Sequence, residues 1–283
     1  MSRKILFKLI AASFALVGAD AALACSSAAW TATGAGAGPI GGVLTGQPNQ
    51  VPSIRRYAGL CGALSQAVGA FHRDESALAE PSYRARFYVY TGLTAGNGVV
   101  FRAADASDAS IARVAYDVAS NSFQFFTGAD AVADATVAGV VANRWYNIEL
   151  NFQNAPTPQL RYTVRGNGTD TPLANDLQIT AGVTGTMVVD RAELGLVSGT
   201  GVAGAITTDA IESRRNTAIG ALCRGNANTD TARNSGDLVA VRNEFLGTAL
   251  ATGNPDCNEE GAINSGDLVC IRNIFLSGAG ACP

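Results

Sequence analysis

The feature that most constrains the fold of this chain is a motif that occurs twice near the C-terminus. Residues 226–246 read NANTDTARNSGDLVAVRNEFL, and residues 256–276 read DCNEEGAINSGDLVCIRNIFL. The copies are offset by thirty residues and share the string NSGDLV. Each copy places a row of oxygen-bearing side chains directly before an amphipathic helical pattern. The repeat therefore predicts a small α-helical module built from two loop–helix units.

Each copy has the ligand spacing of a twelve-residue Ca²⁺ loop, with side-chain oxygens at positions 1, 3, 5 and 12 and a backbone carbonyl at position 7. Ca²⁺ binds about six to eight oxygens, and alternate residues of a tight loop point inward. In loop 1 (residues 226–237) the predicted ligands are Asn226, Asn228, Asp230, Ala232 and Asp237. In loop 2 (residues 256–267) they are Asp256, Asn258, Glu260, Ala262 and Asp267. The cofactor that this spacing predicts is Ca²⁺.

The two loops are not equal. Position 6 of such a loop favours glycine because its turn has a positive φ, and loop 2 has Gly261 where loop 1 has Thr231. Position 8 favours an aliphatic residue, and here loop 2 has Ile263 and loop 1 has Arg233. We expect loop 2 to bind the cation more tightly, although Glu260 is one methylene longer than the usual Asp at position 5.

Apolar residues follow each loop at helical spacing, and each helix of about ten residues is too short to be stable alone. We therefore expect the two helices to pack face to face. The residues expected at their interface are Leu238, Val241, Phe245, Leu246, Leu268, Ile271, Phe275 and Leu276.

The N-terminus has the pattern of an export signal. Arg3 and Lys4 precede a mostly apolar run, and small residues stand at Ala22 and Ala24, as signal peptidase requires. Residues 1–24 are thus expected to be a signal peptide, and the protein is expected to be secreted or at the cell surface. A periplasmic location and lipidation at Cys25 stay open as alternatives. No second apolar segment of spanning length follows, so no transmembrane segment is expected.

Six cysteines in an exported chain indicate disulfides. Zinc is a poor alternative, because the chain has a single histidine, His72, and no CxxC pair. The cysteines fall into one group near the N-terminus and another near the C-terminus, which favours pairing within each group. The expected pairs are Cys25–Cys61, Cys223–Cys282 and Cys257–Cys270, and the other pairings of the last four cysteines stay open.

Between the termini, short alternating segments separated by Gly, Asn, Asp and Pro turns predict an antiparallel β-sandwich. The expected strands are 82–90, 98–103, 111–118, 122–126, 145–152, 160–164 and 186–196. The fold class is therefore mainly β, a sandwich over residues 25–215, joined by a linker at 216–222 to the helical module at 223–283. Residues 26–56 could be a linker or a loop-rich first strand region.

The segment NRWYNIELNFQ, residues 143–153, resembles a strand of laminin-G-like and concanavalin-A-like jelly rolls. The segment ITTDAIESRRNTAIG, residues 206–220, resembles the closing strand of bacterial members, and the likeness covers residues 57–215. It implies a jelly roll that binds a glycan or a protein on its loops or its concave face.

The C-terminal repeat, residues 223–282, resembles a type I dockerin, because it has two copies at the right spacing, Asp at position 12 and no helix before either loop. The resemblance implies a cohesin-like partner. The residues that it implies as docking contacts are Ser235, Gly236, Arg242, Asn243, Ser265, Gly266, Arg272 and Asn273. Gly236 and Gly266 replace a common Ser or Thr, which leaves the identity of the partner open.

Catalysis is not expected. Glycosidases need two carboxylates across a cleft, and the nearest pair on one predicted strand, Asp190 and Glu193, would point to opposite faces. The net charge of −3 does not indicate a nucleic-acid partner. The sequence therefore predicts a secreted, non-catalytic binding or adhesion protein. The alternative is a polysaccharide-degrading hydrolase or its accessory subunit.

Overall fold

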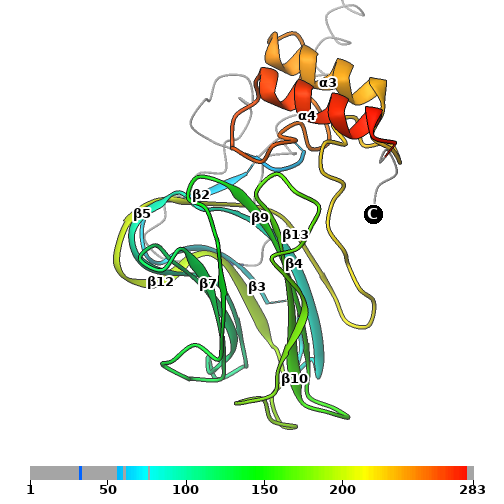
Figure 1. Ribbon diagram of the computed structural model, residues 1–283. Helices are drawn as coiled ribbons and strands as arrows, with labels where there is room; N and C mark the ends of the chain where they lie inside the picture. The colour runs from blue at the N-terminus through cyan, green and yellow to red at the C-terminus, as the bar shows by residue number, and fades with distance from the viewer. Residues whose placement is uncertain (1–31, 34–55, 60–61, 76, 279–283) are drawn as a thin grey trace, which may run out of the picture.

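The computed structural model describes residues 32–33, 56–59, 62–75 and 77–278, and in this part of the chain two antiparallel sheets pack as a β-sandwich (Figure 1). One sheet has the order β1 (Ala32–Thr33), β3 (Ala70–Asp74), β12 (Arg191–Gly204), β5 (Leu93–Ala104), β6 (Ser110–Asp117), β7 (Ser122–Thr127) and β8 (Ala135–Ala138). The other has the order β11 (Ala174–Ile179), β10 (Gln159–Gly166), β9 (Trp145–Gln153), β4 (Ser82–Tyr90), β13 (Ile206–Arg214) and β2 (Ala63–Ser65).

The core lies between the sheets and follows from the alternation of the strands. In β9, Tyr146, Ile148, Leu150 and Phe152 share one face, and all four belong to this core. Their neighbours Trp145, Asn147, Glu149 and Asn151 have the opposite parity and so point to the outer face of the sheet. The C-terminal module and residues 216–222 lie against this outer face.

The hairpin between β6 and β7 is confirmed, and its turn places Asn121 at a φ of +48°. The strand predicted over 186–196 is wrong at its start and its end, because β12 begins at Arg191 and continues to Gly204. Its glycine-rich second half pairs with β5 through register shifts, and glycine weakens the strand signal in a sequence. Four short strands, β2, β3, β8 and β11, were not predicted.

The helices α3 (Ser235–Phe245) and α4 (Ser265–Leu276) follow the two loops. Asn234 and Asn264 are their N-caps, each in a capping box with Asp237 or Asp267 at N3. Val241 meets the buried Ile271 in a small core that Leu238, Leu268 and loop residues complete.

The predicted helix interface is wrong at its far end. Phe245, Leu246, Phe275 and Leu276 are between 45% and 69% exposed. The buried part of the module is filled by Ala227, Ala251 and Cys257 from the loops, so the last helical turns extend past it. In Figure 1 the two helices lie side by side above one end of the sandwich. No helix of the described residues is long and apolar enough to cross a membrane.

Candidate functional sites

Loop 2 holds two buried carboxylates. Asp256 accepts hydrogen bonds from the backbone N–H of Glu260 (3.1 Å) and of Gly261 (2.6 Å), and Asp267 accepts from those of Asn258 (3.2 Å) and Asn264 (2.9 Å). Burial raises the pKa of Asp267 to about 6. Burial, and then the charge of Asp267, raises the pKa of Asp256. A divalent cation between two such groups would favour the ionised form of both.

The donor chemistry of loop 2 fits a hard cation, since its side chains at positions 1, 3, 5 and 12 all carry oxygen. In the part of the chain that the structure describes, no three His, Cys, Asp or Glu side chains converge closely enough to hold a metal by themselves. A cation here would therefore need the amide oxygen of Asn258 and a backbone carbonyl as well. The residues that could hold it are those that the spacing predicts.

Loop 1 has the same backbone plan with less buried charge. Asp237 is buried and accepts from the N–H groups of Ala227 (2.8 Å) and Asn234 (2.7 Å). Asp230 is exposed, and its hydrogen bonds from the N–H of Ala232 and from the amide of Asn234 lower its pKa. Loop 1 thus places one carboxylate, rather than two, in a buried position.

The glycine argument for position 6 is confirmed by the backbone. Gly261 has a φ of +84°, whereas Thr231 stays out of the left-handed region. A feature that the sequence did not predict is that position 4 is left-handed in both loops, with a φ of +63° at Thr229 and +61° at Glu259. Such a φ is strained for residues other than Gly and Asn, and most of all for a β-branched one.

Loop 2 is seated on the outer face of the sandwich through its backbone. The Glu259 carbonyl accepts a hydrogen bond from the backbone N–H of Trp145 (3.0 Å). The Asn258 carbonyl accepts one from the Arg144 guanidinium (3.1 Å), and the Glu260 carbonyl accepts one from the Tyr90 hydroxyl (3.3 Å). These three contacts fix the loop directly above the first residues of β9.

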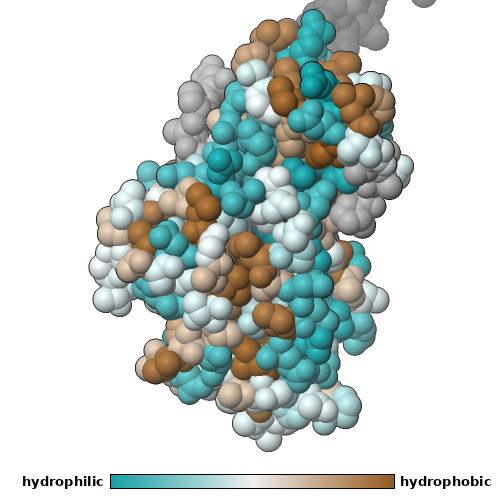
Figure 2. All heavy atoms as spheres, viewed as in Figure 1, coloured by the Kyte–Doolittle hydropathy of each residue, from teal (hydrophilic) through white to brown (hydrophobic). Residues whose placement is uncertain are grey.

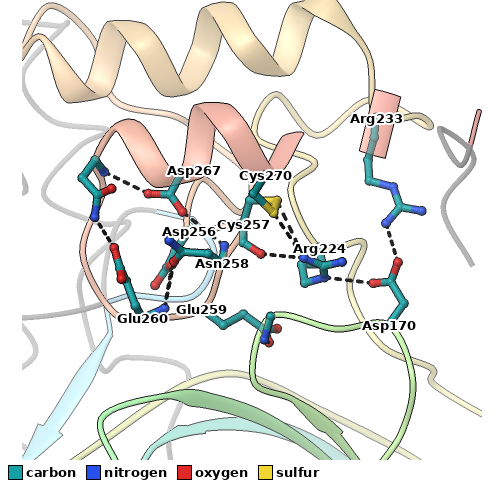
Figure 3. The surroundings of a disulfide bond; sticks show 12 residues. Asp170, Arg224, Arg233, Asp256, Cys257, Asn258, Glu259, Glu260, Asp267 and Cys270 are labelled. Atoms are coloured by element: carbon teal, nitrogen blue, oxygen red, sulfur yellow. Dashed lines mark hydrogen bonds and ion pairs between the residues drawn. A yellow bond between two sulfur atoms is a disulfide. The ribbon is translucent and has the colours of Figure 1, made fainter. Parts of the chain in front are cut away.

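The side chain of Glu259 completes this seat, and Figure 3 shows it pointing from loop 2 toward the sandwich. Its carboxylate accepts from the Tyr57 hydroxyl (3.0 Å) and from the N–H of Gly168 (2.7 Å). Glu259 is only 3% exposed, and burial raises its pKa to about 7. Gly168 is required here, because a Cβ on it would lie 2.9 Å from the carbonyl oxygen of Asn258.

A second anchor is Asp170, which follows β10 and lies between two arginines of the module (Figure 3). It receives hydrogen bonds from Arg224 (3.0 Å) and Arg233 (2.9 Å). Burial would raise the pKa of Asp170, but the two guanidinium groups lower it overall. Arg233, which departs from the aliphatic residue expected at position 8, therefore has a role that the sequence did not reveal: it is buried and ties loop 1 to the sandwich.

The predicted Cys257–Cys270 disulfide is confirmed, and it joins loop 2 to α4 (Figure 3). Arg224 also donates to the carbonyl of Cys257 (2.8 Å), so the second anchor contacts one of the two residues of the disulfide. Cys223 is disulfide-bonded, with a partner outside the described residues. The predicted pairs Cys25–Cys61 and Cys223–Cys282 and the signal peptide 1–24 likewise involve residues outside this range.

The expected docking residues lie on the helices, and the structure leaves most of them accessible. Ser235, Arg242, Ser265, Arg272 and Asn273 are exposed, whereas Gly236, Asn243 and Gly266 are half-buried. Apolar side chains accompany them in matching positions of the two repeats, and Figure 2 shows hydrophobic residues among hydrophilic ones over these helices. The exposed apolar residues are Val239, Phe245, Leu246, Val269, Phe275 and Leu276.

On the opposite side of the sandwich, a groove of about 770 Å³ crosses β12, β5, β6, β7 and β8. The Asn97 amide donates to Gln124 (2.8 Å) on its floor, and the Arg113 guanidinium lies 4.7 Å from the centre of the Phe126 ring. The full lining is Asn97, Val99, Arg113, Gln124, Phe126, Ala131, Val132, Ala133, Thr136, Ser198, Gly199 and Thr200. We refer to this feature as the sheet groove.

Four aromatic residues of the strands are too buried to stack on a ligand. Tyr88, Tyr90, Tyr116 and Trp145 are almost completely buried. Three of them form a cluster with Tyr57, whose ring stacks on that of Tyr88 at 3.6 Å between centroids. This cluster lies beneath loop 2, so these outward-pointing aromatics support the module instead of a sugar. Trp30 lies outside the described residues.

No protein-family model matches the chain, and no curated protein matches it. Its fold is similar to parts of solved structures. Trypanosoma rangeli sialidase in complex with the inhibitor DANA is 16% identical over 58% of this chain and 27% of that chain, with a TM-score of 0.40. An engineered GH43 glycoside hydrolase is 9% identical over 55% and 34%, with a TM-score of 0.41. A heptameric SAP-like pentraxin from Limulus polyphemus is 12% identical over 54% and 76%, with a TM-score of 0.37.

The chain spans about a quarter of the length of the sialidases that it matches. At this level of similarity, none of these structures assigns a family or an activity to the chain.

Asp170→Asn is expected to loosen the module from the sandwich. It removes the charge that pairs with Arg224 and Arg233, and because Asp170 is partly exposed we expect a loss of about 1–2 kcal/mol in the free energy of unfolding. Calorimetry and amide hydrogen exchange of residues 256–260 measure the effect. The control is Asp130→Asn in an exposed loop, and equal behaviour of the two variants would refute the anchor.

Thr229→Asn is expected to stabilise the protein by about 1 kcal/mol, because Asn tolerates the left-handed conformation that Thr229 adopts. Thermal unfolding measures the change. Thr252→Asn, at an exposed position with an ordinary φ, is the matched control and should be nearly neutral. A gain of the same size in the control would show that backbone strain at Thr229 is not the cause.

Proposed function

We propose that the protein is a secreted, non-catalytic glycan-binding protein whose β-sandwich carries the ligand and whose C-terminal module docks a partner protein in a calcium-dependent manner. The observation that carries the first part is the sheet groove. The second part rests on the paired loops and on the accessible outer faces of the helices.

The lining of the sheet groove suits an uncharged carbohydrate. Sugar rings present both hydroxyl groups and C–H faces. Asn97, Gln124 and Thr136 offer amide and hydroxyl groups, while Val99 and Phe126 supply an apolar floor. Its volume of about 770 Å³ is within the usual range for small-ligand sites. An open groove of this kind favours a chain of sugar units over a single enclosed unit.

The carboxylates on the strands do not favour hydrolysis. Glu193 is fully buried and ion-paired with Arg73 (2.5 Å) and Arg102 (2.6 Å). Asp190 accepts from the backbone N–H of Ala79 (2.9 Å) and of Ala106 (3.0 Å). Glycosidases need a carboxylic acid that stays protonated opposite a carboxylate, and the sheet groove has no Asp or Glu among its lining residues. A polysaccharide hydrolase is therefore the second candidate.

For the module we propose that Ca²⁺ binds loop 2, with Asp256, Asn258, Glu260, Asp267 and the carbonyl of Ala262 as ligands, and binds loop 1 more weakly. The bound ion would supply positive charge to a loop that buries two carboxylates. The partner is a cohesin-like protein that contacts α3 and α4. Apolar residues and the exposed Arg242 and Arg272 on those helices have the composition of a protein interface.

Gln124→Ala is expected to weaken glycan binding by the purified full chain about fivefold to tenfold, because it removes a hydrogen-bonding amide from the groove floor. Binding to a panel of neutral polysaccharides, with a reducing-sugar assay alongside, measures it. Gln153→Ala on the other sheet is the control. Release of reducing ends by the wild-type protein would favour the hydrolase, and binding that both variants retain would place the ligand elsewhere.

Glu260→Gln and Asp230→Asn are a matched pair, since both remove the charge at position 5 of a loop. We expect Glu260→Gln to weaken Ca²⁺ binding in calorimetry by about tenfold or more, and Asp230→Asn to change only the weaker phase. Chelation of Ca²⁺ should abolish capture of the partner by the wild-type chain. Equal effects of the two substitutions would contradict the ranking of the loops, and the absence of any Ca²⁺ heat would refute the ligand assignment.

A further inference from the structure

A second pocket lies on the outer face of the sheet that supports the module, well away from the sheet groove. It has a volume of about 360 Å³ and is formed by β4, β9, β10 and β11 together with the segment after β13. The register places Arg84 and Arg161 directly on either side of Asn151, and Thr163 beside Glu149. Side chains that are paired in this way in neighbouring strands lie within contact distance on one face.

The residues expected as a linker form one wall of this pocket. The N–H groups of Ile219 and Gly220 donate to the Glu149 carboxylate (3.1 and 3.2 Å), and Ala218 lines the space. Arg86 donates to the carbonyl of Gly220. The segment is thus held over the sheet by several polar contacts, and the pocket is a built feature between it and the edge strands.

Three residues that line this pocket each have a buried side-chain atom without a hydrogen-bond partner. The Nε of Arg84, the Nη1 of Arg165 and the Oδ1 of Asn151 are buried and have no hydrogen bond. Buried polar atoms of this kind are rare in folded proteins, and several around one space call for a ligand or ordered water. Arg161, by contrast, is satisfied by Asp176, with distances of 2.7 and 2.6 Å.

We propose that this pocket binds a carboxylated sugar of the hexuronate class. Three arginines and two carboxylates line it, which leaves an excess of one positive charge and fits a monoanion. The Asn151 oxygen is an acceptor and therefore requires a hydrogen-bond donor, such as a sugar hydroxyl, which the sulfate dianion lacks. A neutral sugar would leave this excess positive charge uncompensated.

Calorimetry of the full chain with D-glucuronate, D-galacturonate, D-glucose and inorganic sulfate tests the proposal. At least one uronate should bind, and glucose and sulfate should bind at least tenfold more weakly. Arg84→Gln and Asn151→Ala should each weaken uronate binding about tenfold, because a hydrogen bond to or from a charged or buried group is lost. The assignment would be overturned if neither uronate bound, or if sulfate bound as tightly as the uronate.

Two control variants keep this outcome distinct from that of the sheet groove. Arg191→Gln removes an arginine from the opposite sheet, where it pairs with Asp108, and should leave uronate affinity unchanged. Gln124→Ala, in the sheet groove, should also leave it unchanged. If either control weakened uronate binding as much as Arg84→Gln does, the pocket would not be the uronate-binding site. Unchanged melting temperatures of Arg84→Gln and Asn151→Ala establish that any loss is local, and Asn151→Ala alone suffices if Arg84→Gln does not fold.

Discussion

The contact on which the rest of the structure depends is the burial of Glu259 between loop 2 and the sandwich. Its carbonyl accepts from Trp145 and its carboxylate from Tyr57 and Gly168, so one residue satisfies polar groups of three separate segments. The aromatic cluster under it would otherwise be a large exposed apolar patch on the sheet. The two parts of the chain are therefore joined by an interface that resembles a small core rather than by a flexible tether.

This junction also affects which surfaces, proposed above as binding sites, stay accessible. Loop 2 and residues 216–222 cover part of the outer face of one sheet, and the polar pocket beside Asn151 lies on this face. The other sheet keeps its open groove, and the helices keep their outer faces free. The described residues thus present three surfaces of different chemistry: an amide-rich groove, an arginine-lined pocket and an apolar helical face.

Much of the fold could be predicted from local patterns. The alternation in β9 separates the two faces that the structure shows, and the capping residues Asn234 and Asn264 precede helices where the repeat indicated them. What failed depends on distant partners. Glycine-rich β12 is stabilised by pairing with β5, and Phe245 and Phe275 are exposed because loop residues fill the module core. Likewise, Arg233 departs from the residue type expected in a metal loop. Its role follows only from its contact with Asp170, which lies far away in sequence.

The repeat also explains why loop 2 is joined to its own helix by a disulfide and loop 1 is not. Thirty residues before Cys257 and Cys270 stand Ala227 and Ala240, which pack in the same small core without a bond between them. A disulfide persists whatever the ionic content of the surroundings, whereas loop 1, which has none of its own, would depend on the cation that we propose. Depletion of the cation would then loosen loop 1 before loop 2, while the ion pair of Arg233 with Asp170 keeps loop 1 attached to the sandwich. The protein would pass through a partly opened form instead of unfolding the module in a single step.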